Sequence, residues 1–575
     1  MSHSPRRRPY LLGMFSLGMT LFSGLLFAAD ATPEATAAAT RQRPGHAAIA
    51  SANFLATNAG FEVLAKGGNA FDAAVAVAST LSVVEPESSG IGGGFMAVLH
   101  HAKDGSNVFI DARETAPAAV NSKDYLKPDG TPDRDASING PLSAGIPGEP
   151  AGLALIAKRY GRLSLKQSLA PAIRIARDGF VPDPRLHEAV VAKQKTLLRW
   201  PASAAKYLVD GKPPAEGALW RDPDQARTLE LIAEHGADGF YRGEIASKLV
   251  DAVSAAGGNW TLADLAGYQA KQRDPISVDY RGYQIITAPP PSSGGVAIAE
   301  VLNILSGYDL GKMDQVQRVH YMIEAMRRAF RDHNDYLGDP DFVKMPLEML
   351  LSPYYADGLR QGILPDRATP SSMLPRAEAK EPGKHTTHFS IIDADGNMVS
   401  MTATVNTTLA SKFVAAGTGV LLNNEMDDFA LVPNQPNAYG LLGSAANAPV
   451  GGKRMLSSMS PSIVIGADRT AVIGSPGGST IITQVLEGIL NFIDGESASQ
   501  ITAHKRFHHQ YLPDEVMVEE GTFDQPTSDA LTRMGYELKP NESWGFMNVV
   551  TWDHKSNKLD AASDPRRPSG LGKVK

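Results

Sequence analysis

The stretch HTTHFSIIDADGNMVSMTATVN at 385–406 decides the fold. Two strand-like segments, 387–392 and 398–405, flank the strong turn signal DADGN, so a β-hairpin is predicted. A two-residue Asp-Gly loop would mix polar and apolar side chains on both faces of the hairpin. A three-residue loop from Ala394 to Gly396 separates the two kinds and puts glycine where a left-handed residue is needed, so we expect this register.

In this register the side chains on one face of the hairpin are all polar. The opposed pairs on that face are Thr386 with Thr404, His388 with Thr402, and Ser390 with Ser400, while Thr387, Phe389 and Ile391 share the other face with Ala403, Met401 and Val399. Taken alone, such a polar ladder favours the solvent-exposed face of a hairpin.

The polar ladder has a second interpretation because Thr386 follows an unusual segment. Residues from about 365 to 385 are charged, rich in proline and nearly free of large apolar side chains, as expected of an exposed linker. A cut between His385 and Thr386 would give Thr386 a free α-amine. The reference pKa of such an amine, about 7.7–8.0, suits a general base for the threonine's own hydroxyl. The sequence therefore predicts an N-terminal threonine nucleophile, with Thr404 placed opposite to orient it.

Residues 1–29 have the features of a secretory signal peptide. Three arginines at 6–8 precede an almost wholly apolar run, and Ala28-Ala29 offers a small-residue cleavage site. An uncleaved membrane anchor is the alternative, since the run is just long enough to span a bilayer. We expect cleavage and a periplasmic or secreted product without membrane attachment.

Charge and cysteine content exclude several classes of function. The formal net charge is −7 and becomes more negative once the leader's arginines are removed, which argues against nucleic acid as a partner. The chain has no cysteine, so disulfides, thiolate metal sites and a cysteine nucleophile are excluded. His508 and His509 are adjacent and would point to opposite faces of a strand, so we expect no catalytic metal.

The pattern of apolar residues changes along the chain. Apolar residues recur at helical spacing in 152–178, 225–235, 297–306 and 316–330, and two helices separated by GGN at 67–69 are expected between Ala47 and Val84. Strand patterns follow the linker, among them 462–466 and 470–474. We expect a helix-rich first half, an exposed segment and a strand-rich second part, arranged as two or more domains or as one large one.

Several motifs, in order along the chain, resemble γ-glutamyltranspeptidases. They are GGNAFDAAVA (67–76), SSGIGGGFM (88–96), DARETAP (111–117), GIPGEPAG (145–152), APPPSSGG (288–295), TTHFSIIDADGNMVSMTATVNTT (386–408), LLNNEMDDF (421–429), RMLSSMSPS (454–462), GSPGGST (474–480), RFHHQYLPDE (506–515) and ASDPR (562–566). The resemblance implies an α+β fold, the four-layer αββα sandwich of N-terminal-nucleophile hydrolases. It also implies a precursor that cleaves itself before Thr386, giving a heterodimer of a large subunit, 30–385, and a small one, 386–575.

The resemblance also implies roles for individual residues. The expected carboxylate-binding residues are Arg113, Ser457 and Ser458, the expected ammonium-binding residues are Glu425 and Asp428, Asn406 would add a polar contact, Gly477 and Gly478 would form the oxyanion hole, and Tyr439 would belong to a lid at 433–447. The chain departs from the family at Leu409-Ala410, where many members have Phe-Gly, and at His385, where bacterial relatives have Gln.

Without the resemblance each of these residues has a simpler interpretation. Arg113 would form a surface ion pair, Glu425 and Asp428 would lie on an acidic loop, Ser457 and Ser458 would be ordinary loop polarity, and the two glycines would form a plain turn. A phosphate-binding loop is excluded at these glycines, because the lysine and the spacing of that motif are absent.

The expected activity is that of a γ-glutamyltransferase and glutathione hydrolase without a cofactor. Its substrates would be glutathione and other γ-glutamyl compounds, and the acceptors would be water, amino acids or dipeptides. Two rivals remain open. A glutaryl-cephalosporin acylase on the same scaffold would gain nothing from Glu425 and Asp428, whereas a periplasmic amino-acid- or peptide-binding protein would need neither the linker nor a cut.

Overall fold

The computed structural model describes residues 42–374, 386–431, 437–441 and 443–575. The chain divides into two units, 1–42 and 43–575, and the fold below is that of the second. The expected signal peptide, the expected cleavage residue His385 and part of the expected lid lie outside the described residues. No helix among the described parts of the chain is long and apolar enough to cross a membrane.

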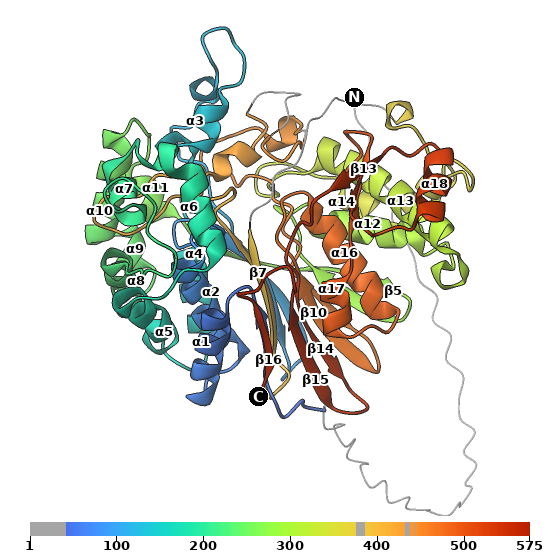
Figure 1. The fold of residues 1–575 in the computed structure, drawn as a ribbon, viewed down its shortest axis with the longest axis horizontal. Coiled ribbons are helices and arrows are strands. Elements are labelled where there is room, and N and C mark those ends of the chain that lie inside the picture. The colour runs from blue at the N-terminus through green and yellow to red at the C-terminus, as the bar shows by residue number, and fades with distance from the viewer. Residues whose placement is uncertain (1–41, 375–385, 432–436, 442) are drawn as a thin grey trace, which may run out of the picture. The chain divides into compact units, whose positions relative to one another are not determined.

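Two antiparallel sheets form the centre of this unit (Figure 1). The first has the order β16-β1-β7-β8-β2-β3-β4, with strands β16 (Leu571–Val574), β1 (Ala48–Ser51), β7 (Thr387–Ile392), β8 (Met398–Thr404), β2 (Gly94–His101), β3 (Ser106–Ala112) and β4 (Lys271–Arg273). The second has the order β15-β14-β10-β9-β6-β5, with β15 (Lys558–Ser563), β14 (Asn548–Asp553), β10 (Arg469–Gly474), β9 (Ser462–Ile465), β6 (Tyr283–Thr287) and β5 (Ile276–Tyr280). A small third sheet joins β11 (Phe507–His508), β12 (Val516–Glu519) and β13 (Leu538–Asn541).

Helices cover the outer face of each large sheet. Against the first sheet lie α1 (Phe54–Ala65), α2 (Ala70–Val84) and α4 (Glu149–Tyr160), backed by α5 (Leu165–Asp178), α6 (Pro184–Leu197), α7 (Pro201–Tyr207), α8 (Pro223–His235), α9 (Asp238–Tyr241), α10 (Gly243–Ala255) and α11 (Leu262–Gly267). Against the second lie α12 (Gly294–Leu305), α16 (Thr480–Ile493) and α17 (Ala498–Ala503), with α13 (Gln315–Tyr336), α14 (Leu347–Leu350), α15 (Pro353–Arg360) and α18 (Gln525–Arg533) around them. The short α3 (Arg134–Ile138) stands apart at the edge. The predicted four-layer αββα fold is confirmed.

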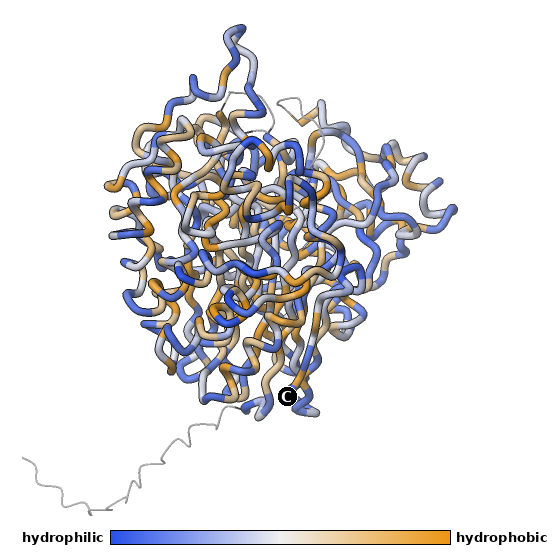
Figure 2. The backbone as a smooth tube through the Cα atoms, turned by 60° about the vertical axis from the view of Figure 1, so that its left-hand side comes forward, coloured by the Kyte–Doolittle hydropathy of each residue, from blue (hydrophilic) through white to orange (hydrophobic). Residues whose placement is uncertain are grey.

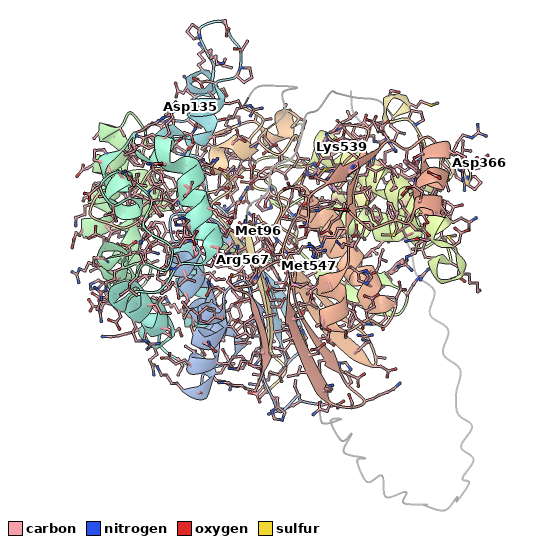
Figure 3. All side chains as sticks on the ribbon, in the orientation of Figure 1. Met96, Asp135, Asp366, Lys539, Met547 and Arg567 are labelled. Carbon is pink, nitrogen blue, oxygen red and sulfur yellow. The ribbon has the colours of Figure 1, made fainter. Side chains whose placement is uncertain are left out.

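The central strands of the two large sheets are buried on both faces, and hydrophobic stretches run through the middle of the unit (Figure 2). Phe389, Ile391 and Met401 face α1, α2 and α4 in one apolar core. A second core fills the space around the other sheet and its helices, and Met96 and Met547 belong to it (Figure 3).

The predicted hairpin register is confirmed. Thr387 pairs with Ala403, His388 with Thr402 and Ser390 with Ser400. Gly396 has a φ of 89° and donates its N–H to the carbonyl of Asp393, closing the three-residue loop. The separation of polar from apolar side chains therefore identified the correct register. A shift of the strand pairing by one residue would have turned polar side chains into the apolar core.

The interpretation of the polar ladder as a solvent-exposed face was wrong, because this face packs on the second sheet. His388 is fully buried, and its ring bonds to Thr402 Oγ1 at 2.9 Å and Ser390 Oγ at 3.1 Å. Ser390 Oγ donates to the carbonyl of Asn548 on β14, and Ser400 Oγ donates to that of Ile473 on β10. The polar side chains thus satisfy one another and the backbone of the facing sheet, which makes their burial affordable.

Other expectations held in part. The 152–178 pattern is two helices, because Ser164 forms a capping box with Gln167 and starts α5 afresh. Residues 48–51, expected within a helix, form β1 between β7 and β16. The expected helix-rich first part and strand-rich second part are confirmed, since α1–α15 and β1–β6 precede the linker whereas α16–α18 and β7–β16 follow it. The two parts do not form separate domains, because both large sheets combine strands from before and after the linker.

Candidate active site

Thr386 and Thr404 meet where the central hairpin opens, at the start of β7 and the end of β8. Their hydroxyl oxygens are 3.3 Å apart, and the two residues are 4% and 3% exposed. Thr404 Oγ1 also accepts the N–H of Asn406 at 2.8 Å. Thr404 is therefore positioned to orient the Thr386 hydroxyl, as the hairpin register predicted.

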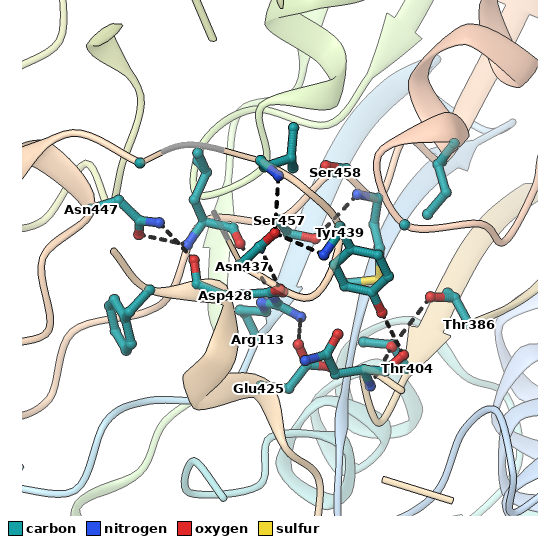
Figure 4. Close-up of a pocket in the computed structure, with 18 of the residues that line it drawn as sticks. Arg113, Thr386, Thr404, Glu425, Asp428, Asn437, Tyr439, Asn447, Ser457 and Ser458 are labelled. Atoms are coloured by element: carbon teal, nitrogen blue, oxygen red, sulfur yellow. Dashed lines mark hydrogen bonds and ion pairs between the residues drawn. The ribbon is translucent and has the colours of Figure 1, made fainter. Parts of the chain in front are cut away.

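The threonine pair lines a pocket of about 590 Å³, its open mouth included (Figure 4). The predicted site residues that line it are Thr386, Thr404, Arg113, Asn406, Glu425, Asp428, Tyr439, Ser457, Ser458 and Gly478. They come from segments far apart in the sequence. Gly477 is not among the lining residues, although it is the chain neighbour of Gly478.

Arg113 forms the charged centre of the pocket. It follows β3 and is 1% exposed, which excludes the surface ion pair suggested by its sequence context. Its Nη1 is 2.7 Å from Glu425 Oε2 and its Nη2 is 2.5 Å from Asp428 Oδ2 (Figure 4). Glu425 and Asp428 bracket one turn of 3₁₀ helix, so both carboxylates reach the same guanidinium.

Three carboxyl groups surround this single guanidinium. Glu114 is fully buried, with its Oε2 3.8 Å from Arg113 Nη1. Burial raises the pKa of Glu425 to about 7, although Arg113 opposes this, and burial raises the pKa of Glu114 to about 8. Burial also raises the pKa of Asp428 well above its usual range. The ammonium group of a ligand would place a second cation beside these carboxyl groups and favour their ionised forms.

Ser457 and Ser458 directly follow the two residues whose backbone carbonyls bind Arg113. Arg113 donates to the carbonyls of Met455 and Leu456, and Ser457 follows directly. The Ser457 backbone is fixed by Ser293, whose N–H donates to its carbonyl at 2.8 Å, and by the carbonyl of Pro291, which accepts the Ser457 N–H at 2.9 Å. The segment just before α12 therefore positions Ser457.

Gly477 and Gly478 precede α16 and have φ values of 141° and 61°. A Cβ on Gly477 would lie 2.6 Å from Thr480 Oγ1, so glycine is required there by space as well as by conformation. The glycines place the N-terminus of a helix beside the pocket, where its dipole favours a developing negative charge.

The loop after β8 explains one departure from the family pattern. Asn406, Leu409, Ala410 and Lys412 have positive φ values of 76°, 53°, 50° and 59°. Glycine adopts such values without strain, which gives a physical reason for the family's glycine where this chain has Ala410. Despite the change, Asn406 still lines the pocket and its Nδ2 donates to the carbonyl of Asn424 at 2.8 Å.

Tyr439 closes one side of the pocket. It is 5% exposed, its hydroxyl donates to the carbonyl of Asn406 at 2.7 Å, and its ring points toward the threonine pair (Figure 4). Asn437, which sequence reasoning missed, lines the pocket and donates to Asp428 Oδ1 at 3.3 Å. His333 on α13 was missed as well, since a lone histidine on a helix carries no recognisable signal.

Among the residues that the structure describes, no group of three or more His, Asp or Glu side chains is arranged to hold a metal ion.

Comparisons with known proteins identify the family of this chain. The family described as Gamma-glutamyltranspeptidase matches residues 56–574. The chain is 42% identical over 536 residues to a glutathione hydrolase proenzyme from Pseudomonas sp. (strain A14), with 91% of this chain and 93% of the relative covered. It is 41% identical over 567 residues to the glutathione hydrolase proenzyme of Escherichia coli (strain K12), with 96% and 97% covered.

Solved structures show the same architecture. A cephalosporin acylase from Bacillus halodurans matches with a TM-score of 0.80 at 29% identity, over 96% of this chain and 99% of that one. The γ-glutamyltranspeptidase of Helicobacter pylori matches with a TM-score of 0.54 at 39% identity, over 56% of this chain and 92% of the solved chain. The protein is therefore an enzyme of the γ-glutamyltranspeptidase family.

Proposed function

We propose that this enzyme is a γ-glutamyltransferase and glutathione hydrolase whose nucleophile, Thr386, is released by cleavage after His385. The observation that carries the proposal is that Thr386 lines the same pocket as the buried Arg113, Glu425 and Asp428. That pocket joins a hydroxyl nucleophile to groups of both charges, as a γ-glutamyl group with its α-carboxylate and α-ammonium requires.

Binding would rearrange the charges at the centre of the pocket. The α-carboxylate would accept hydrogen bonds from Arg113, Ser457 and Ser458, because a guanidinium fork fits a carboxylate. The α-ammonium would bind Glu425 and Asp428, which lie against Arg113 in the structure. A zwitterionic ligand thus adds one charge of each sign and leaves no carboxylate without a cation nearby.

The chemistry would proceed through an ester on Thr386. The Thr386 amine takes the hydroxyl proton as Oγ1 attacks the γ-amide carbonyl, and N–H groups at Gly477 and Gly478 hold the oxyanion. The amine then returns the proton to the leaving nitrogen, and the C–N bond breaks. Water attacking the ester gives hydrolysis, whereas the amine of an amino acid or dipeptide gives transfer.

The names of the relatives support self-processing, since both curated relatives are called proenzymes. The large subunit, 30–385, and the small subunit, 386–575, would remain together as a heterodimer, because both central sheets contain strands from each of them. With the leader removed, the product would be periplasmic or secreted.

The acylase alternative is not favoured, although a cephalosporin acylase shares the fold. A glutaryl group has no ammonium, so it would leave Glu425 and Asp428 buried with only Arg113 between them. Comparing the hydrolysis of γ-glutamyl and glutaryl anilides separates the two activities.

The decisive experiment is N-terminal sequencing and intact-mass analysis of the wild type, Thr386→Ala and Thr386→Ser. We expect two chains in the wild type, one starting at Thr386, and turnover of a γ-glutamyl anilide. Thr386→Ala should stay a single inactive chain, whereas Thr386→Ser, which keeps a hydroxyl, should be cleaved. A cleaved and active Thr386→Ala protein would contradict the mechanism, and an uncleaved wild type would favour a binding protein.

A further inference from the structure

Residues 437–441 form a compact turn that supplies one wall of the pocket. The side chain of Asn437 accepts the N–H groups of Tyr439 and Leu441 at 2.9 and 3.1 Å, so the turn is internally bonded. Asn437, Tyr439 and Leu441 all line the pocket. The position of this wall depends on what attaches the turn to the rest of the molecule.

Within the described residues, three hydrogen bonds attach the turn to its surroundings. Tyr439 donates its hydroxyl to the Asn406 carbonyl at 2.7 Å, and Asn437 donates to Asp428 at 3.3 Å. The third is the N–H of Ala438, which donates to Asp427 Oδ2 at 2.7 Å. It is a charge-assisted bond to a fully buried carboxylate, and such bonds are stronger than neutral ones.

Asp427 is fixed from its other side by α3. Its Oδ1 accepts the hydroxyl of Ser137 at 2.7 Å and Arg134 Nη1 at 3.2 Å. Asp427 does not line the pocket, whereas its neighbour Asp428 does. The two adjacent carboxylates therefore face opposite ways: Asp428 faces Arg113, and Asp427 joins α3 to the turn.

We propose that Asp427 is a positioning residue that holds the 437–441 wall against the bound γ-glutamyl group and so limits the entry of water to the ester. The inference rests on the proposed function. In Asp427→Asn the side chain keeps only one acceptor oxygen, whereas the donors lie on two sides, Ala438 on one and α3 on the other. Either Ala438 or α3 therefore loses its acceptor. The wall then loosens, while Thr386, Thr404 and Arg113 keep their places.

The test compares Asp427→Asn with Asp135→Asn. Asp135 lies on α3 like Arg134 and Ser137, but its carboxylate binds Arg199 and Asn139 at an exposed position (Figure 3), so it is a matched control. In Asp427→Asn we expect the donor KM to rise about tenfold, as for loss of one hydrogen bond to a charged group. The ratio of hydrolysis to transfer should rise as well, with cleavage at Thr386 intact. Ser137→Ala should shift the same quantities less.

A double-mutant cycle distinguishes positioning of the wall from a general structural effect. Asp427 and Tyr439 hold the same turn, so Asp427→Asn and Tyr439→Phe should be less than additive in donor KM, whereas Asp135→Asn and Tyr439→Phe should be additive. Hydrogen exchange at the Ala438 amide should be faster in Asp427→Asn than in Asp135→Asn.

Each outcome is decisive. Equal KM, product ratio and amide exchange in Asp427→Asn and Asp135→Asn would overturn the inference, as would additive effects with Tyr439→Phe. If Asp427→Asn does not fold, Ser137→Ala decides, and an unchanged donor KM in that variant would overturn the inference. The wild type and Asp135→Asn test the proposed function separately, through their turnover of a γ-glutamyl anilide.

Discussion

Glu425 is a buried carboxyl group of the pocket whose pKa lies close to neutral pH. Burial raises its pKa to about 7, Arg113 opposes that rise, and Glu114 adds to it. Below this pKa the side chain is mainly neutral, and above it the side chain is an anion able to attract an ammonium group. The charge that we assign to substrate recognition therefore develops near neutral pH.

Product inhibition by L-glutamate measures this charge. Between about pH 6 and about pH 8 the inhibition constant of L-glutamate should fall about tenfold, because ionised Glu425 binds the ammonium. Glutarate, which lacks the ammonium, should bind no better as the pH rises. Glu425→Gln should remove the pH dependence for L-glutamate, and a slope that persists in this variant would assign the effect to another group.

At the scale of elements, the central hairpin depends on one residue of its loop. Gly396 has a φ of 89°, and a Cβ there would meet nothing closer than 3.6 Å. A side chain would therefore cost conformational energy without a steric clash. The loop fixes the register, and the register places Thr404 opposite Thr386.

Two identical substitutions should have opposite effects on stability. Gly396→Ala should lower the free energy of unfolding by about 1 kcal/mol, the cost of a left-handed conformation with a Cβ. Gly358→Ala, at an exposed position in α15 where a Cβ meets nothing within 4 Å, should raise it by up to about 1 kcal/mol. Thermal unfolding of both variants checks the signs, and a stabilised Gly396→Ala protein would refute the strained-loop account.

At the scale of the whole molecule, the two sheets meet through polar side chains, and this contact is close. A Cβ on Gly474 of β10 would lie 2.1 Å from the ring of His388. Only glycine at this position therefore allows the two sheets to come so close. Burial lowers the pKa of His388 to about 3, and burial lowers the pKa values of His508 and His333 to about 4. These histidines are neutral in the folded protein.

Acid should therefore destabilise the fold through these histidines. Between the unfolded pKa, about 6.5, and the lowered folded values, the unfolded chain binds more protons than the folded one, so stability falls as pH falls. Each histidine contributes up to about 1.4 kcal/mol per pH unit in that range. In this range His388→Gln should lower the slope of the unfolding free energy against pH by the equivalent of one bound proton. His46→Gln, at an exposed position, should leave the slope unchanged. Equal slopes in both variants would contradict this assignment.

The local features follow from the sequence alone: the hairpin register, the helix start at Asn69, and the motifs that contain the site residues. These depend on periodicity and on caps, both of which involve chain neighbours. Only the tertiary structure decided that the polar ladder is buried, that 48–51 is a strand, and that Asp427 and Asp428 face opposite ways. Alternation in a strand shows which side chains share a face, but what covers that face depends on packing between segments hundreds of residues apart.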